Sequence, residues 1–140
     1  MDKAIASSET ELVVPFFDID SMAIVWHGHY AKYFELARCA LLETIDYNYE
    51  QMRASGYAWP IIDMRIRYAR PATFGQKILV QAQLVEWENR LKINYQIFDK
   101  VSGTRLTRGY TSQVAVDMAT HEMCFESPAI LWQKLGIQRR

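Results

Sequence analysis

The sequence predicts an α+β domain in which one long helix packs on a largely antiparallel sheet. An apolar stripe at helical spacing runs over Tyr30–Ile45, and strand-length segments with alternating apolar residues follow between Ile62 and Val116. Short turns separate these segments, and short turns join antiparallel neighbours. Because a helix with one apolar face must bury it against another element, the stripe is expected to lie on the sheet. The chain has no internal repeat or linker, so we expect one domain, 1–140.

The first half of the chain holds the predicted helices. A strand is expected over Leu12–Phe16, followed by a helix over Tyr30–Ile45 that is about 24 Å long, at about 1.5 Å per residue. A second, short helix over Tyr49–Ala54 is expected to end at Gly56, because glycine is common just past a helix C-terminus.

The second half of the chain supplies the strands of the predicted sheet. Four are expected: Ile62–Tyr68, Ile78–Trp87, Leu91–Ile97 and Leu106–Val116. Asp99–Gly103 has the composition of a hairpin turn, and Gly109 inside the last strand marks a bulge or a close approach of two backbones. The core is expected to span about residues 12–118, with a peripheral C-terminal segment, 119–140.

Composition and charge argue against several functional classes. Half of the residues are hydrophobic and 23% are charged, as in ordinary globular proteins. Lys+Arg and Asp+Glu balance at 16 each, so no overall charge favours nucleic acid. Cys39 and Cys124 are too few for a disulfide framework. The N-terminus lacks a signal-peptide layout, and no apolar run approaches the roughly 20 residues that span a bilayer. We therefore expect a cytoplasmic protein.

The most informative segment is Phe17–Tyr30, a loop between the first strand and the long helix. It carries two carboxylates, two imidazoles and a glycine: Asp18, Asp20, His27, His29 and Gly28. The first N–H groups of a helix have no intrahelical acceptor, so a helix start stabilises developing negative charge. A carboxylate beside it can act as a base or a nucleophile. The loop therefore holds both parts of an acyl-transfer site.

The pattern D-x-D-x(4)-V-W-H-x-x-Y from Asp18 to Tyr30, followed by Tyr-Phe-Glu-Leu-Ala-Arg up to Arg38, resembles the hotdog-fold acyl-CoA thioesterases. The similarity is to the branch with 4-hydroxybenzoyl-CoA thioesterase and the Tol-Pal-associated short-chain acyl-CoA thioesterases, and it covers about Leu12 to Val116. It implies an antiparallel sheet wrapped around one central helix. It also implies thioester hydrolysis with no cofactor besides the CoA of the substrate, and homodimers with sheets joined edge to edge, often paired into tetramers.

The resemblance implies that Asp20, the second aspartate of the pattern, is the catalytic nucleophile or the base for water. The alternative is that Asp20 caps a turn, as aspartates do in many loops. His27 matches a histidine of the short-chain branch. Its side chain could orient water, and its backbone N–H, or a neighbour's, is the expected oxyanion donor; packing at the helix entry is the alternative. Asp18 is expected to shape the loop by accepting backbone N–H groups.

Five further residues are expected on the substrate side of the site: Ala23, Val25, Trp26, Tyr30 and Glu35. Many relatives carry glycine in place of Ala23, and alanine resists a positive φ. Tyr30 is expected to pack in the core at the pocket wall. Trp26 and Trp59 could line an aromatic pocket or belong to the core or an interface. Glu35 is the reserve base, since other hotdog enzymes use a helix glutamate; a solvated or ion-paired glutamate is the alternative.

The remaining predictions concern ligands. Contacts to CoA phosphates are expected from Arg65, Arg67, Arg70, Arg90 and Lys92, because relatives hold the nucleotide with such residues at the surface; a solvated face explains each equally well. The carrier could be CoA or an acyl carrier protein, and an acidic carrier would favour a basic rim around the pocket. No metal is expected, because His27 and His29 at i and i+2 do not share a helix face and His121 is remote.

Two other functions stay open at this point. A hotdog hydratase or dehydratase typically has a His-Phe-Pro loop and a Pro-Gly helix start, and neither occurs in this sequence. A non-catalytic module that binds acyl-CoA or a partner would have no use for a nucleophile beside an oxyanion site. Polar polyene, short aliphatic and aromatic acyl groups are all compatible with the sequence.

Overall fold

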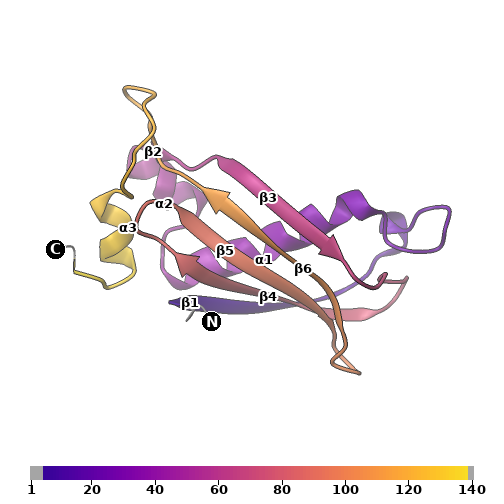
Figure 1. The fold of residues 1–140 in the computed structure, drawn as a ribbon. Coiled ribbons are helices and arrows are strands. Elements are labelled where there is room, and N and C mark those ends of the chain that lie inside the picture. Colours follow the sequence, from indigo (N-terminus) through magenta and orange to yellow (C-terminus); the bar gives the residue numbers. More distant parts are fainter. Residues whose placement is uncertain (1–4, 139–140) are drawn as a thin grey trace.

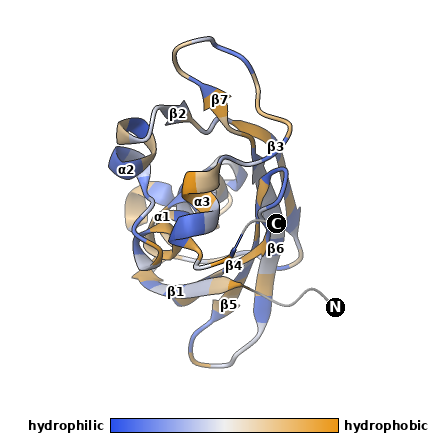
Figure 2. Cartoon of the chain, turned by 90° about the vertical axis from the view of Figure 1, so that its left-hand side faces the viewer, coloured by the Kyte–Doolittle hydropathy of each residue, from blue (hydrophilic) through white to orange (hydrophobic). Residues whose placement is uncertain are grey.

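The computed structural model describes residues 5–138 and shows a five-stranded antiparallel sheet curved around one long helix (Figures 1 and 2). Its elements are β1 (Ala6–Val13), the 3-10 turns η1 (Phe16–Asp18) and η2 (His27–His29), α1 (Tyr30–Thr44), α2 (Tyr49–Ala54), β2 (Tyr57–Ala58), β3 (Ile61–Tyr68), β4 (Lys77–Glu86), β5 (Leu91–Asp99), β6 (Arg105–Gln113), β7 (Val116–Asp117) and α3 (Ala129–Lys134). The sheet order is β1-β4-β5-β6-β3, and β2 pairs with β7. The predicted α+β hotdog arrangement is confirmed.

Both predicted helices are present. The apolar stripe of α1 is buried in the core, at Tyr30, Tyr33, Phe34, Ala37, Leu41 and Leu42. The start of α2 is fixed by the backbone N–H of Asn48, which donates to Gln51 Oε1 at 3.0 Å. Gly56 follows α2 with φ of 91°, a left-handed conformation that glycine adopts without steric cost. No helix in residues 5–138 is both long and apolar enough to cross a membrane.

The first strand begins earlier than predicted. The sequence predicts a strand over Leu12–Phe16, whereas β1 is Ala6–Val13 and Phe16 already belongs to η1. In β1, half-buried residues alternate with residues that face solvent, and most residues of the strand are polar. Because strand prediction depends on alternating apolar residues, this segment gives little signal in the sequence. Ser8 shows why a polar residue fits there, since its Oγ donates to the carbonyl of Ala37 in α1 at 3.0 Å.

Gly109 marks a close approach, one of the two possibilities that the sequence raised. A Cβ at this position would lie 2.2 Å from the backbone oxygen of Arg65 and 2.8 Å from the ring of Phe34. Phe34 in turn stacks on Tyr95 of β5, with ring centroids 4.4 Å apart. The helix α1 therefore presses on the sheet at Gly109, and only a residue without a side chain fits between them.

The C-terminal segment, expected to be peripheral, sends one side chain into the core. Leu131 of α3 is fully buried. Trp132 ties the same helix to the preceding loop, because its Nε1 donates to the carbonyl of Ser127 at 3.1 Å. The expected peripheral region 119–140 also includes 139–140, which lie outside the described residues.

Candidate active site

The loop between β1 and α1 is anchored by Asp18. Its carboxylate is buried, accepts the Tyr33 hydroxyl at 2.6 Å and the Lys32 ammonium at 2.7 Å, and lies 3.8 Å from Nδ1 of His29. Burial by itself raises the pKa of Asp18, but hydrogen bonds from Lys32 and Tyr33 outweigh it, and the net pKa lies below the usual value. Asp18 therefore ties the loop to the first turns of α1.

This anchoring corrects the predicted role of Asp18. The sequence predicts that Asp18 accepts backbone N–H groups in a turn, but its partners are side chains of α1. It is Asp20 that makes the turn, because Oδ1 of Asp20 accepts the backbone N–H of Met22 at 2.8 Å. The alternative that Asp20 caps a turn is therefore correct for its Oδ1. Its Oδ2 has no hydrogen-bond partner in the described part of the chain and is free for chemistry.

Ala23 adopts the conformation that glycine favours. Its φ is 64°, and its backbone N–H donates to the carbonyl of Asp20 at 3.0 Å. The N–H of Asp20 donates to the carbonyl of Ile24 at 2.9 Å, which closes the turn. Alanine in this region costs roughly 1–2 kcal/mol relative to a right-handed conformation. The methyl group of Ala23 therefore leaves the turn intact, with a strained residue next to the free oxygen of Asp20.

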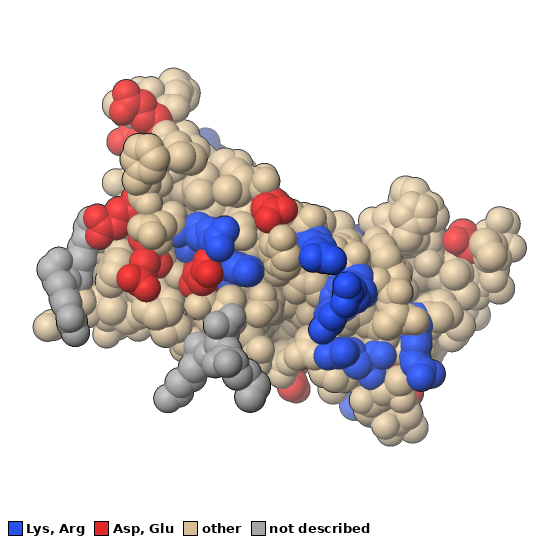
Figure 3. Space-filling model, in the orientation of Figure 1, with Lys and Arg blue, Asp and Glu red and all other residues tan. Residues whose placement is uncertain are grey.

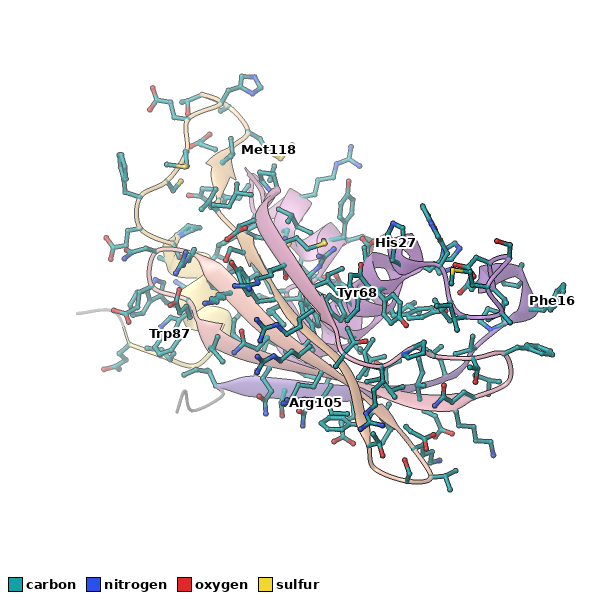
Figure 4. The ribbon with its side chains drawn as sticks, turned by 45° about the vertical axis from the view of Figure 1, so that its right-hand side comes forward. Phe16, His27, Tyr68, Trp87, Arg105 and Met118 are labelled. Atoms are coloured by element: carbon teal, nitrogen blue, oxygen red, sulfur yellow. The ribbon has the colours of Figure 1, made fainter. Side chains whose placement is uncertain are left out.

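His27 lies at the helix start but is not packed there. Its side chain is exposed, at the beginning of the 3-10 turn η2 that leads into α1. Its carbonyl accepts the hydroxyl of Tyr68 at 2.8 Å, and the two rings are 6.4 Å apart (Figure 4). Tyr68 is the last residue of β3, so this bond fixes the loop Phe17–Tyr30 to one end of the edge strand. The first N–H groups of the turn are available as donors.

Of the other expected substrate-side residues, two belong to the protein interior. Tyr30 is buried, as predicted, and its hydroxyl accepts the backbone N–H of Ala72 at 3.2 Å. Val25 is also buried, and its N–H donates to the carbonyl of Ala72 at 2.9 Å. Trp26 is half-exposed beside His27, with ring centroids 5.0 Å apart.

An apolar chamber of about 670 Å³ lies at the other end of β3. Its walls come from the second half of α1, from α2, and from the segments around β2, the start of β3 and β7; they include Leu42, Met52, Tyr57, Trp59, Ile61 and Met118. Figure 4 shows Met118 near this end of β3, away from His27 and Tyr68. Trp59 is anchored by a hydrogen bond from its Nε1 to Tyr47 Oη at 3.1 Å. The chamber is the right size for a small-molecule ligand.

Glu35 lines this chamber and does not lie at the Asp20 loop of its own chain. Its carboxylate is mostly exposed and accepts from Nη2 of Arg38 at 3.0 Å, which is the ion-paired alternative that the sequence left open. Within one chain, Asp20 and His27 therefore lie at one end of β3, whereas Glu35 and the chamber lie toward the other end.

The five expected phosphate contacts fall into two groups. Arg65 and Arg67 share a groove on the outer face of the sheet. Arg70 follows the end of β3 outside this groove, Arg90 pairs through Nε with Glu86 at 2.5 Å, and the Lys92 ammonium lies 4.7 Å from the centre of the Tyr110 ring. In residues 5–138, no three His, Cys, Asp or Glu side chains are grouped so as to hold a metal ion.

Comparison with known proteins identifies the family. The profile of the thioesterase-like superfamily matches residues 14–133. The chain belongs to this superfamily. YneP of Bacillus subtilis, a candidate acyl-CoA thioesterase, is 26% identical to it over 111 residues, which make up 79% of this chain and 80% of YneP.

Two solved structures agree with this assignment. The hypothetical protein TT1821 of Thermus thermophilus is 27% identical and superposes with a TM-score of 0.81, over 92% of this chain and 97% of that one. DHNA-CoA thioesterase of Staphylococcus aureus is 25% identical, with a TM-score of 0.77 over 85% of this chain and 80% of that one. The chain is therefore a hotdog-fold thioesterase, as the sequence predicts.

Sequence reasoning missed most of the chamber of the thioesterase. Its lining comes from elements that are far apart in the chain, and of the lining residues the sequence singles out only Glu35 and Trp59 for the substrate side. Met52 and Tyr57 give a weak signal, because they are apolar residues on either side of the Gly56 turn. Arg105 and Arg108, which complete the outer groove with Arg65 and Arg67, were also missed.

Proposed function

We propose that the protein hydrolyses acyl- or aroyl-CoA thioesters to the free acid and thiol, in a site shared by two copies of the chain. The observation that carries this proposal is the placement of two half-sites at opposite ends of β3. Asp20 and the helix start adjoin the Tyr68 end through the bond between Tyr68 and His27. The chamber adjoins the Ile61 end. Neither half alone combines the N–H donors of the helix start with a place for the acyl chain.

Pairing of two β3 strands joins these halves. The outer edge of β3 has no strand neighbour in the described chain, since β6 lies on its other side. Apolar side chains are exposed along it, including Ile62 and Met64. If two copies pair antiparallel about the middle of β3, Ile61 of one lies opposite Tyr68 of the other. The catalytic loop of one copy then meets the chamber of its partner, and Asp20 faces the partner subunit's Glu35.

The proposed reaction uses the free oxygen of Asp20. Oδ2 of Asp20 accepts a proton from a water molecule as the water oxygen attacks the thioester carbonyl. Backbone N–H groups at the start of η2 donate to the oxyanion, where they need no reorganisation as charge develops. Collapse of this intermediate breaks the carbon–sulfur bond and releases the thiolate, which takes up a proton. Direct attack by Asp20 through an anhydride would use the same two groups.

The acyl group is expected to be mainly apolar. The chamber walls carry aromatic and thioether side chains from Trp59, Tyr57 and Met52, and its volume of about 670 Å³ accommodates an aryl group or a medium-length alkyl chain. The identity of the S. aureus neighbour as a DHNA-CoA thioesterase supports an aroyl group on CoA as the first substrate to try.

The test is thiol release from a panel of short, long and aromatic acyl-CoAs by wild type and by Asp20→Asn. Asparagine keeps the oxygen that accepts the N–H of Met22 but cannot act as a base. The expected loss in turnover is about 10²–10⁴-fold. Asp99→Asn is the matched control, because Asp99 also caps a turn, with its Oδ2 accepting the N–H of Ser102 at 3.0 Å, and lies outside the site.

The result contradicts the assignment if both variants retain wild-type turnover, because Asp20 is then only a turn residue. Glu35→Gln would be the next variant to measure. If wild type releases no thiol from any acyl-CoA, the same panel on acyl carrier protein separates the choice of carrier from the absence of hydrolysis.

A further inference from the structure

The wall of the apolar chamber holds one buried polar atom without a partner. Six buried side-chain nitrogen or oxygen atoms have no hydrogen-bond partner within residues 5–138, and Gln113 is the only residue among these six that lines the chamber. Gln113 is the last residue of β6, opposite Ile61 of β3 and Leu91 of β5, and it is only 5% exposed. A buried acceptor without a donor is unfavourable, and native proteins leave few of them.

The orientation of the Gln113 amide is fixed by its nitrogen. Nε2 donates to the backbone carbonyl of Trp59 at 2.7 Å. If the amide were turned over, its oxygen would face the carbonyl oxygen of Trp59, and two acceptors would be in contact. Trp59 is itself held by the bond from its Nε1 to Tyr47 Oη. The unpaired atom is therefore the acceptor Oε1, and the partner that it lacks is a donor.

The missing donor has to come from the chamber. Oε1 of Gln113 is shielded from solvent, so bulk water does not reach it. A ligand reaches it by displacing part of the chamber wall. Met52 and Met118 belong to this wall, and unbranched methionine side chains adapt their shape to a ligand. A ligand group that donates to Oε1 gains a hydrogen bond without breaking one inside the protein.

Charge contributes little to recognition in the chamber. Figure 3 shows Lys and Arg side chains gathered over the outer face of the sheet, and Figure 1 shows α1 behind the sheet in the same orientation. On the chamber side, Glu35 and Arg38 pair with each other at 3.0 Å, and Arg53 of α2 is exposed. A neutral hydrogen bond is therefore the polar contact that the buried part of the chamber offers to an acyl group.

We propose that the chamber selects an acyl group that carries a hydroxyl, and that this hydroxyl donates to Oε1 of Gln113. A hydrocarbon at the same point leaves Oε1 unpaired, and an ether brings a second acceptor against it. Sites that hydrogen-bond a hydroxyl reject the analogue without it far more strongly than an apolar pocket rejects a poor fit. The inference rests on the proposed function, because that function places the acyl group in the chamber.

The first test measures binding and does not depend on hydrolysis. The probes are 4-methylphenol and 4-methylanisole, two aromatic molecules of similar shape, of which only the first donates a hydrogen bond. In calorimetry, wild type is expected to bind 4-methylphenol at least about 10-fold more tightly than 4-methylanisole. Ala58→Trp, which fills the chamber from β2, should bind neither probe, and this result places the probes in the chamber.

Gln113→Met removes the amide at similar side-chain length. The ratio of the two dissociation constants is expected to fall from about 10 to about 1. The ratio is the decisive quantity, because loss of the bond to Trp59 can weaken the binding of both probes alike. Gln81→Met is the matched control, since Gln81 is half-buried outside the chamber and its Oε1 accepts from Gln96 at 3.2 Å. This control should keep the wild-type ratio.

The second test compares thiol release from 4-hydroxyphenylacetyl-CoA and 4-methoxyphenylacetyl-CoA. The value of kcat/KM should favour the hydroxyl compound in wild type and in Gln81→Met, but not in Gln113→Met. If wild type prefers 4-methylphenol and releases no thiol, the chamber selects a hydroxyl and the proposed hydrolysis is wrong. Equal binding of the two probes by wild type, no binding of 4-methylphenol, or an unchanged ratio in Gln113→Met overturns the inference, whether or not thiol is released.

Discussion

The two edge strands of the sheet differ in what they present to solvent. β1 exposes polar and charged side chains such as Ser7, Glu9 and Glu11. β3 exposes the apolar residues Ile61, Ile62 and Met64 in alternation with the charged residues Asp63, Arg65 and Arg67. Charged residues on an edge strand discourage pairing with another chain, whereas exposed apolar residues on an unpaired edge favour it. The apolar residues of β3 therefore make this edge better suited to association than β1, and both the Asp20 loop and the chamber adjoin β3.

Met64→Glu should produce the largest effect that separates these edges. Met64 is 40% exposed in the single chain, so the fold tolerates a charge there, but a pair of β3 strands would bury it. We expect a shift from dimer to monomer and a loss of thiol release of at least about 100-fold, because each site needs two copies. Light scattering after gel filtration gives the mass. Val13→Glu on the exposed side of β1 is the control and should change neither property.

Mixing two inactive variants tests directly whether the site is shared. One variant is Asp20→Asn, and the other is Ala58→Trp, which fills the chamber from an exposed position in β2. In a mixed dimer, the intact loop of one copy meets the intact chamber of the other. Random assembly makes half of the dimers mixed, each with one good site of two, so about a quarter of wild-type activity should return.

The mixing experiment has a clear contrary outcome. If each chain holds a complete site, every copy in the mixture carries a defect, and activity stays at the level of the separate variants. Mixing Asp20→Asn with Asp20→Ala is the negative control. Both changes remove the same carboxylate, so every dimer in that mixture has two defective loops and no activity should return.

Asp18→Asn is expected to lower the stability of the protein, because Asp18 anchors the loop beside β3 to α1. The pKa of Asp18 in the folded state is below its unfolded value. The contribution of Asp18 to the free energy of unfolding is therefore present above about pH 4 and is lost as the pH falls through the folded-state pKa. At pH 7, the neutral amide weakens two charge-assisted hydrogen bonds, and the free energy of unfolding should fall by roughly 2–3 kcal/mol. Urea denaturation at pH 7 and at pH 3 measures this, and the difference from wild type should shrink at pH 3.

Ser8→Ala is the matched change at the β1 edge. It removes the hydrogen bond from Ser8 Oγ to the carbonyl of Ala37 and should cost about 1 kcal/mol. Because Ser8 does not titrate, the cost should be the same at both pH values. A pH-independent effect of Asp18→Asn would show that the ion pair with Lys32 contributes no stability.

Much of the fold follows from local patterns in the sequence. The helices α1 and α2 and the strands β3 to β6 are predicted because their apolar periodicity is strong and their turns carry typical residues. β1 is misplaced because it is an edge strand whose inner face is lined partly by Ser8 and Thr10. Strand prediction depends on alternating apolar residues, and an edge strand such as β1 can pack against a helix through polar side chains such as Ser8.

The site is predicted less completely, for reasons of geometry. The motif locates the candidate loop with Asp20 and His27, because its residues are close together in the chain. It does not show which aspartate is anchored, since that depends on Lys32 and Tyr33 one helical turn into α1. The chamber and the outer groove are assembled from distant elements, and Arg67 meets Arg108 only through the register of β3 and β6.

Gly109 sets how closely α1 approaches the sheet. The ring of Phe34 contacts the backbone at this glycine. In α1, Phe34 is flanked by Tyr33, whose hydroxyl binds Asp18 of the loop, and by Glu35, which lines the chamber. A single methyl group there would meet the carbonyl of Arg65 in β3 and the ring of Phe34, so it would push α1 away from the sheet. The Asp20 loop and the chamber would then both shift, each in its own site of the proposed dimer. Displacements of about 1 Å can cost about 100-fold in rate. The absence of a side chain at Gly109 thus fixes the distance between α1 and the sheet, and the alignment of the groups on α1 depends on that distance.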